Sequence, residues 1–276
     1  MRSRLLRLGV PLLAWAALML PVRILMFQER ITSWGQVIDL GHLWYIEHLL
    51  LFSLVYALWR HLRKGRGDVG QSQTAATPGH LAILGSGLVV ALVTIVVRYF
   101  WFPIDRWVNL LGFFRVAFAD VPRDLAFFIA GAVAYRRGWF QRFPTRAGLI
   151  WLGVGLAASA FYYAFAMGLL KGLTWTIMRP LYCFWEELVC CGMCIGLLVL
   201  FREALNRQGR FAAWLAQNQY AAYVYHEIFV VPLQIAALGL ALPPLAKFFL
   251  VTLLSAPLVF LFSAWTRQSR AVRAVL

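Results

Sequence analysis

Residues 81–101 read LAILGSGLVVALVTIVVRYFW, and residues 81–97 of this stretch carry no charged side chain. Crossing the hydrocarbon core of a bilayer takes about 20 mainly apolar residues in a helix. A helix also satisfies its own backbone hydrogen bonds, which lipid cannot do. The stretch therefore predicts a membrane-spanning helix.

The rest of the chain has the same character. Of its 276 residues 62% are hydrophobic and 13% are charged, and the mean hydropathy is +0.73. A soluble domain of this size cannot bury so much apolar surface. We expect an all-α membrane bundle of about eight helices, forming a single domain over residues 1–276. The expected spans are 6–27, 42–59, 81–101, 122–136, 147–170, 181–201, 219–241 and 246–265.

The net charge of +15 indicates how the chain lies in the membrane. If both termini are cytoplasmic and all eight spans cross, the cytoplasmic segments hold 17 of the 26 basic residues and two of the 11 acidic ones. The other segments hold nine of each, so the whole positive excess lies on one side, as the positive-inside bias predicts. The short span 122–136 is needed for this result. The distribution of basic residues thus predicts how the spans are oriented across the membrane, and a nucleic-acid partner is not expected.

Motifs for a resident cofactor are missing from the sequence. The four cysteines, Cys183, Cys190, Cys191 and Cys194, all fall in one expected span. Cys191 and Cys194 form a CxxC pair, but the partner ligands of a zinc site do not accompany it. We expect packing cysteines, no metal site and no permanently bound cofactor.

Titratable residues begin the span that starts with GHLWYIEHLLLF, residues 41–52. His42 would lie at the outer interface, with Glu47 and His48 about 8–9 Å deeper. Ionisable side chains inside a membrane are costly and are candidates for function. His42, Tyr45 and His48 share one broad helix face. The alternative is that His42 caps the helix and Glu47 pairs with a basic neighbour.

Polar groups also interrupt the region from Arg98 to Asp124. Broken apolar segments at membrane depth occur where they are buried in protein or line a wet cavity. We expect a half-submerged helix here, leading into the short span, with Arg115 and Arg123 in a charged pocket floor. An ordinary loop with self-paired charges is the alternative.

Two further stretches place charges inside spans. In YCFWEELVCC, residues 182–191, Glu186 or Glu187 is expected to pair with Arg179 or Arg115. In NQYAAYVYHEIFVVPLQ, residues 218–234, a polar stripe follows helical spacing and must face other helices or water. The stripe consists of Tyr220, Tyr223, Glu227 and Gln234, with His226 beside it. A hydrogen-bonded packing histidine is the alternative there.

Four stretches together resemble the acyltransferase 3 family of integral membrane O-acyltransferases. GHLWYIEHLLLFSLVYAL resembles the family's HLW-aromatic-leucine helix, and NQYAAYVYHEIFVVPL resembles its late helix with a tyrosine pair and a histidine. RSRLLRLGVPLLAWAALMLP resembles the arginine-rich entry to its third helix. DLAFFIAGAVAYRRGWF resembles its phenylalanine-rich span that ends in arginine.

The resemblance implies a ten-helix bundle in the bacterial inner membrane. Such a bundle moves an acyl group, acetyl or succinyl, from a cytoplasmic acyl-CoA to a hydroxyl of an extracytoplasmic carbohydrate or glycan, as in polysaccharide O-acetylation. The family's first helix carries a basic residue and, about ten positions later, a histidine regarded as catalytic. Nothing here matches that helix, so the chain is expected to lack the family's first two helices.

The expected site follows from these residues and the resemblance. His42 with Glu47 is assigned to the outer, acceptor-facing end, and His226 with Glu227 to a level about 10 Å from the cytoplasmic face. A histidine would act as general base on the sugar hydroxyl. The expected substrate-binding residues are Tyr45, His48, Arg115, Arg123, Glu186 and Tyr223. A transporter or export component for a sugar or acyl compound, and a non-catalytic remnant of the family, remain alternatives.

Overall fold

The computed structural model describes residues 5–26, 41–62, 76–101, 106–110, 114–207 and 209–276. In this part of the chain the fold is helical, with one small two-stranded sheet. The chain divides into two compact units. Unit 1 contains residues 1–62, 109–115 and 208–276, and unit 2 contains residues 63–108 and 116–207.

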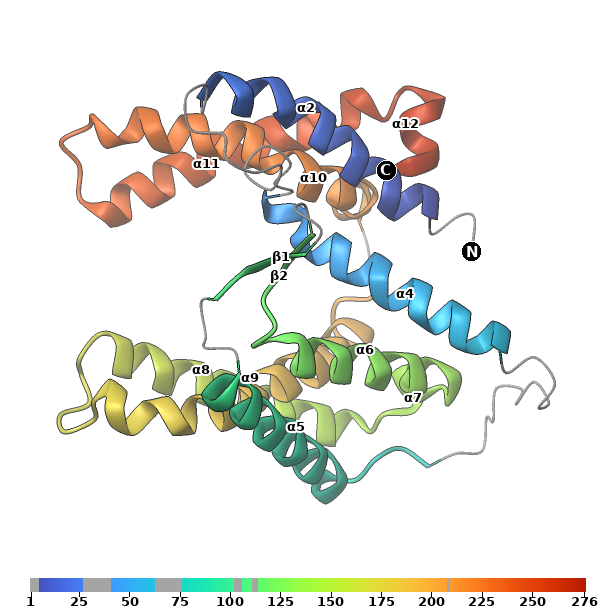
Figure 1. Cartoon of the computed structure of the whole chain (residues 1–276), viewed down its shortest axis with the longest axis vertical. Helices are drawn as coiled ribbons and strands as arrows, with labels where there is room; N and C mark the ends of the chain where they lie inside the picture. Colours follow the sequence, from blue (N-terminus) through green and yellow to red (C-terminus); the bar gives the residue numbers. More distant parts are fainter. Residues whose placement is uncertain (1–4, 27–40, 63–75, 102–105, 111–113, 208) are drawn as a thin grey trace. The chain divides into compact units, whose positions relative to one another are not determined.

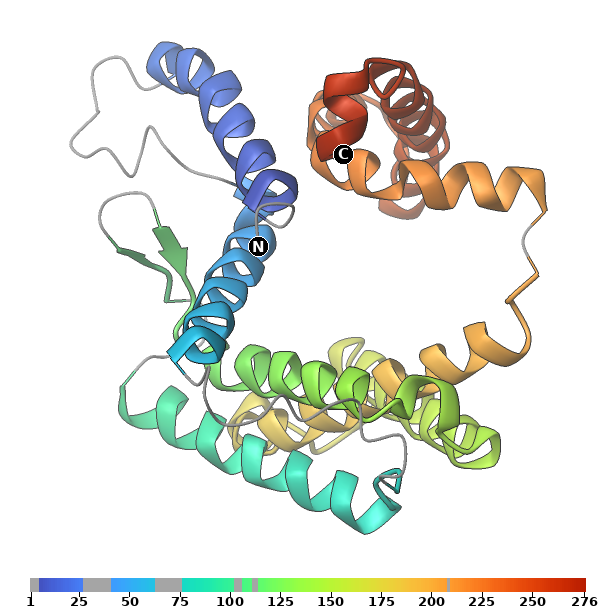
Figure 2. The ribbon, with the colours of Figure 1, turned by 90° about the vertical axis from the view of Figure 1, so that its right-hand side faces the viewer.

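Unit 1 is built from both ends of the sequence. Its helical elements are η1 (Leu5–Gly9), α2 (Val10–Met26), η2 (Gly41–Leu43), α4 (Trp44–Leu62), α10 (Arg210–Leu238), α11 (Pro244–Thr266) and α12 (Arg270–Val275). The long helices α10 and α11 lie side by side (Figure 2). An apolar core joins α2, η2, α4 and α10, and its buried members are Leu12, Trp15, Leu43, Ile46 and Val224.

Unit 2 holds the middle of the sequence. Its helices are α5 (His80–Phe100), α6 (Val121–Arg136), α7 (Trp139–Arg142), α8 (Thr145–Ala166) and α9 (Trp175–Glu203). Helices α8 and α9 form its central pair, and α5 packs against α9 (Figure 1). Helices α8 and α9 approach each other closely because glycines meet at their contact. A Cβ on Gly192 would lie 2.5 Å from the backbone nitrogen of Gly155.

Five of the described helices are long and apolar enough to cross a membrane: α5, residues 181–203 of α9, α8, α10 and α11. Helices α2 and α6 are shorter, with 17 and 16 residues. Helix α4 has 19 residues but carries Glu47, His48 and Arg60. The chain is thus a helical multi-pass membrane protein, while the count of eight spans and the cytoplasmic termini stay predictions.

The region before α6 differs from the expectation. Residues Val108–Leu110 and Phe114–Val116 form the strands β1 and β2, which pair with each other. The predicted half-submerged helix is therefore wrong at these residues. Valine and phenylalanine favour strands, and Gly112 in the sequence between them disfavours a continuous helix.

Candidate functional site

A tight turn in unit 1 brings the start of α4 onto the middle of α10. Gly41 adopts a left-handed conformation with φ of 53°, which glycine reaches without steric cost. A Cβ at this position would also lie 3.2 Å from Oε2 of Glu227. Glycine therefore lets η2 place His42 directly against α10.

Both ring nitrogens of His42 are bonded to α10. Nδ1 lies 2.5 Å from Oε2 of Glu227, and Nε2 lies 3.2 Å from the carbonyl oxygen of Val224. The hydroxyl of Tyr223 donates to the carbonyl of His42 at 2.6 Å. Since a carbonyl oxygen only accepts, Nε2 must carry a proton. Neither nitrogen of His42 is left to take a proton from a substrate.

His226 has the opposite arrangement. Its Nδ1 donates to the carbonyl oxygen of Tyr223, one helical turn earlier, at 2.7 Å. This bond fixes the tautomer with the lone pair on Nε2. The side chain is half-buried, and none of the described residues forms a hydrogen bond with its Nε2. A histidine held in this way can accept a proton from a hydroxyl.

The two histidines lie together. Their ring centroids are 4.5 Å apart, and the rings of Trp15 and Tyr223 lie 4.7 and 5.7 Å from that of His42. We call His42, Tyr223, His226 and Glu227 the histidine cluster. It joins residues of η2 and α10 and combines a carboxylate, a fixed imidazole and an imidazole with an available nitrogen.

The sequence predicted the members of this cluster but not their pairing. Glu227 bonds to His42, whereas Glu47 had been expected there. The predicted separation into an outer and an inner level is also wrong, because the rings of His42 and His226 are in contact. Helix α10 starts at Arg210, so His226 lies about 24 Å along it, well away from that end.

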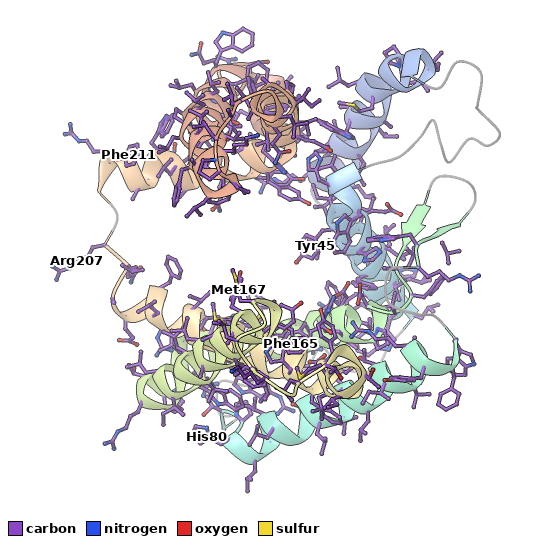
Figure 3. All side chains as sticks on the ribbon, turned by 90° about the vertical axis from the view of Figure 1, so that its left-hand side faces the viewer. Tyr45, His80, Phe165, Met167, Arg207 and Phe211 are labelled. Carbon is purple, nitrogen blue, oxygen red and sulfur yellow. The ribbon has the colours of Figure 1, made fainter. Side chains whose placement is uncertain are left out.

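The other predicted residues of α4 take different positions. Glu47 and His48 are buried, with 1% and 3% of their surface exposed. The ring of His48 lies between those of Trp44 and Phe52, at centroid distances of 5.3 and 6.0 Å. Tyr45 is half exposed and projects from α4 (Figure 3). The side chain of Arg115 lies outside the described residues.

Unit 2 contains a separate charge network. Arg98 of α5 bonds to Asp120 at 2.7 Å, lies 2.8 Å from Glu186 and also donates to the carbonyl of Ala119. Arg123 of α6 contacts Glu186 as well, and bonds to Asp124 at 3.1 Å. The network ties α5, α6 and α9 together through ion pairs between two arginines and three carboxylates.

This network adds two residues to those predicted. One of Glu186 and Glu187 is expected to meet Arg179 or Arg115, whose side chains lie outside the described residues; among the described residues, Glu186 pairs with Arg98 and Arg123. Arg98 and Asp120 were not among the predicted site residues. An arginine near the end of a span that is otherwise apolar was the signal for Arg98. In the described part of the chain, no group of three metal-binding side chains lies close enough to hold an ion.

Comparisons with known proteins identify the chain's family. Residues 1–265 match the family model described as an acyltransferase domain. The search of curated proteins gave no match, and neither did that of solved structures.

Proposed function

The chain belongs to the acyltransferase 3 family, and from this premise we propose that it transfers an acyl group, acetyl or succinyl, from acyl-CoA to a carbohydrate hydroxyl. The acceptor would be an extracytoplasmic glycan, and the protein would work in the bacterial inner membrane. Five helices able to cross a bilayer support a membrane location. The acetyl or succinyl group and the glycan come from the sequence resemblance.

The observation that carries the proposed mechanism is the geometry of His226. Its Nδ1 is held by the Tyr223 carbonyl, so Nε2 is left to act as general base. In the proposed reaction Nε2 takes the proton of the acceptor hydroxyl as its oxygen attacks the thioester carbon. The carbon–sulfur bond breaks, and the departing thiolate of coenzyme A receives the proton from His226. The products are an ester and free coenzyme A.

His42 and Glu227 would act as positioning residues in this scheme. The bond between Nδ1 of His42 and Glu227 holds the ring of His42 against that of His226. The packed ring limits the rotation of His226 and keeps its Nε2 direction constant. Because His42 has both nitrogens engaged, it is the weaker candidate for the base.

Replacement of His226 tests the proposal. We expect His226→Gln to lower acyl transfer by about 10²–10⁴-fold, the usual contribution of a general base. Membrane vesicles from cells producing the tagged chain would be given radiolabelled acetyl-CoA or succinyl-CoA. The measurement is the alkali-labile label on the endogenous envelope glycans, corrected for the amount of folded protein.

The matched control is His61→Gln, since His61 is exposed in the last turn of α4. It should transfer acyl groups at the rate of the unmodified chain. Unchanged transfer by the folded His226→Gln protein would refute the assignment of the base. No transfer by the unmodified chain, with uptake of a labelled acyl or sugar compound, would refute the proposed activity.

A further inference from the structure

An apolar pocket lies between α5, α8 and α9, entirely within unit 2. Its volume is about 280 Å³. One wall is formed by α5 with Ile83, Leu84 and Leu88, and the other walls come from α8 and α9. His80 marks the start of α5 and Phe165 the last turn of α8 in Figure 3. The pocket shares no residue with the histidine cluster.

Two residues that line this pocket carry buried polar atoms without a hydrogen-bond partner among the described residues. These atoms are both carboxyl oxygens of Glu187 on α9 and the indole nitrogen of Trp151 on α8. Each residue has only 3% of its surface exposed. Buried polar groups are nearly always paired in proteins, and an unpaired one is costly. Two such groups at one pocket point to a ligand that supplies their missing hydrogen-bond partners.

The pocket is reached through apolar side chains. Leu84, Leu88 and Leu188 border it and are 46%, 50% and 37% exposed. Helices α5 and α9 both have the length and composition of membrane spans. Since lipid tails surround such helices, the ligand enters from the hydrocarbon. A water molecule would pair with these polar atoms but would leave the apolar walls of the pocket without contacts, so the walls favour an occupant that also carries a hydrocarbon chain.

We propose that this pocket binds a membrane lipid that carries a hydroxyl group. The indole N–H of Trp151 only donates, so the ligand must supply an acceptor. An uncharged carboxyl group at Glu187 has an O–H that donates and a C=O that accepts. To pair with the C=O as well, the ligand must also supply a donor. A hydroxyl provides both functions, whereas an ester or ether cannot donate and an ammonium cannot accept. The lipid chain lies against the leucines of α5.

Photolabelling of the full-length protein in lipid nanodiscs tests this site. The probe is hexadecanol with a diazirine in its chain, and the matched probe is its methyl ether, which lacks the donor. We expect the alcohol to label peptides of α5 and α9 and to be displaced by unlabelled hexadecanol. The ether should label these peptides about tenfold less, the size expected for the loss of a buried hydrogen bond.

Variants on both sides of the pocket provide the controls. Glu187→Leu should reduce labelling about tenfold, whereas Glu187→Gln, which still donates and accepts, should retain it. Gly87→Leu should also block labelling, since a Cβ there lies 3.7 Å from the Cys191 sulfur and a longer side chain fills the pocket. Glu203→Leu, at the end of the same helix, should have no effect.

Three results would overturn the proposal. They are equal labelling by alcohol and ether, unchanged labelling of Glu187→Leu, and no labelling at α5 and α9 by either probe in the folded protein. The last result would assign the pocket to water or to another segment of protein. The readout is lipid binding and needs no acyl transfer, so it is independent of the proposed function.

Discussion

His42 and His226 belong to one cluster, yet their hydrogen bonds give them different chemistry. Both nitrogens of His42 face acceptors, a carboxylate and a carbonyl. His226 has one nitrogen held by a carbonyl, and no described residue bonds the other. The sequence indicates both histidines as polar residues of apolar segments, but Glu227, the carboxylate that pairs with His42, lies 185 positions away in the sequence. Residue type therefore predicts candidates, and the hydrogen bonds separate their roles.

At the residue scale, Arg98 should be important for stability. Its side chain is 3% exposed and is paired with both Asp120 and Glu186. We expect Arg98→Leu to lower the free energy of unfolding by about 3–5 kcal/mol, because it leaves two partly buried carboxylates undercompensated. The double variant with Glu186→Leu should be less destabilised than the sum of the single variants. Unfolding in mixed detergent micelles measures these values.

Arg146→Leu is the control for Arg98, since Arg146 is exposed in the first turn of α8. Its effect should stay within about 0.5 kcal/mol. An Arg98→Leu protein as stable as the unmodified chain would show that the network contributes nothing to the fold.

At the scale of elements, the close packing of α8 against α9 depends on glycines, which place no side chain at the contact. A Cβ on Gly192 would lie 2.5 Å from the nitrogen of Gly155 and 2.8 Å from the carbonyl oxygen of Trp151. Small residues at helix contacts are typical of membrane bundles, where close packing replaces much of the hydrophobic driving force. The same packing supports the pocket, because Trp151 and Glu187 reach it from these two helices.

Gly192→Ala should therefore destabilise unit 2. Overpacking a close contact costs about 1–3 kcal/mol, and the atoms it would meet are backbone atoms, which cannot rotate away. Gly153→Ala on α8 is the matched control, since nothing lies within 4 Å of a Cβ there. Alanine at that position should be neutral or stabilise by about 0.5–1 kcal/mol. Equal thermal unfolding temperatures of the two variants would contradict the close contact.

The elements themselves were largely predictable from sequence. All eight expected spans overlap a helix, because apolar length is a local property that can be read along the chain. The expectation failed between α5 and α6, where β1 and β2 replace a helix. That segment is short and polar residues interrupt it, so neither a helical nor a strand period is established there.

At the scale of the whole molecule, the sequence makes a clear statement about sidedness. The positive excess of +15 falls on one side only if every expected span crosses. The segment between α8 and α9, with Lys171, is then outside, and that between α9 and α10, with Arg207, is cytoplasmic. Both residues are exposed.

Cysteine labelling checks this prediction. With the four native cysteines replaced by alanine, Lys171→Cys should react with a membrane-impermeant maleimide in intact cells. Arg207→Cys should react only after the cells are permeabilised, and Arg146→Cys should behave in the same way as a second inner site. Reaction of both inner sites in intact cells would reverse the predicted orientation. Labelling of Arg146 and Arg207 from different sides would change the number of crossings between them.

Without any structure, the amino-acid sequence already indicates that the chain is helical, lies in a membrane and belongs with the acyltransferases. Hydropathy, charge and short motifs are properties of neighbouring residues, so folding is not needed to detect them. The tertiary structure decided that His42 meets Glu227, that Glu186 meets Arg98 and Arg123, and that Trp151 and Glu187 border one pocket. These pairs join residues far apart in the sequence, and only the packing of helices brings them within hydrogen-bonding distance or around a common space.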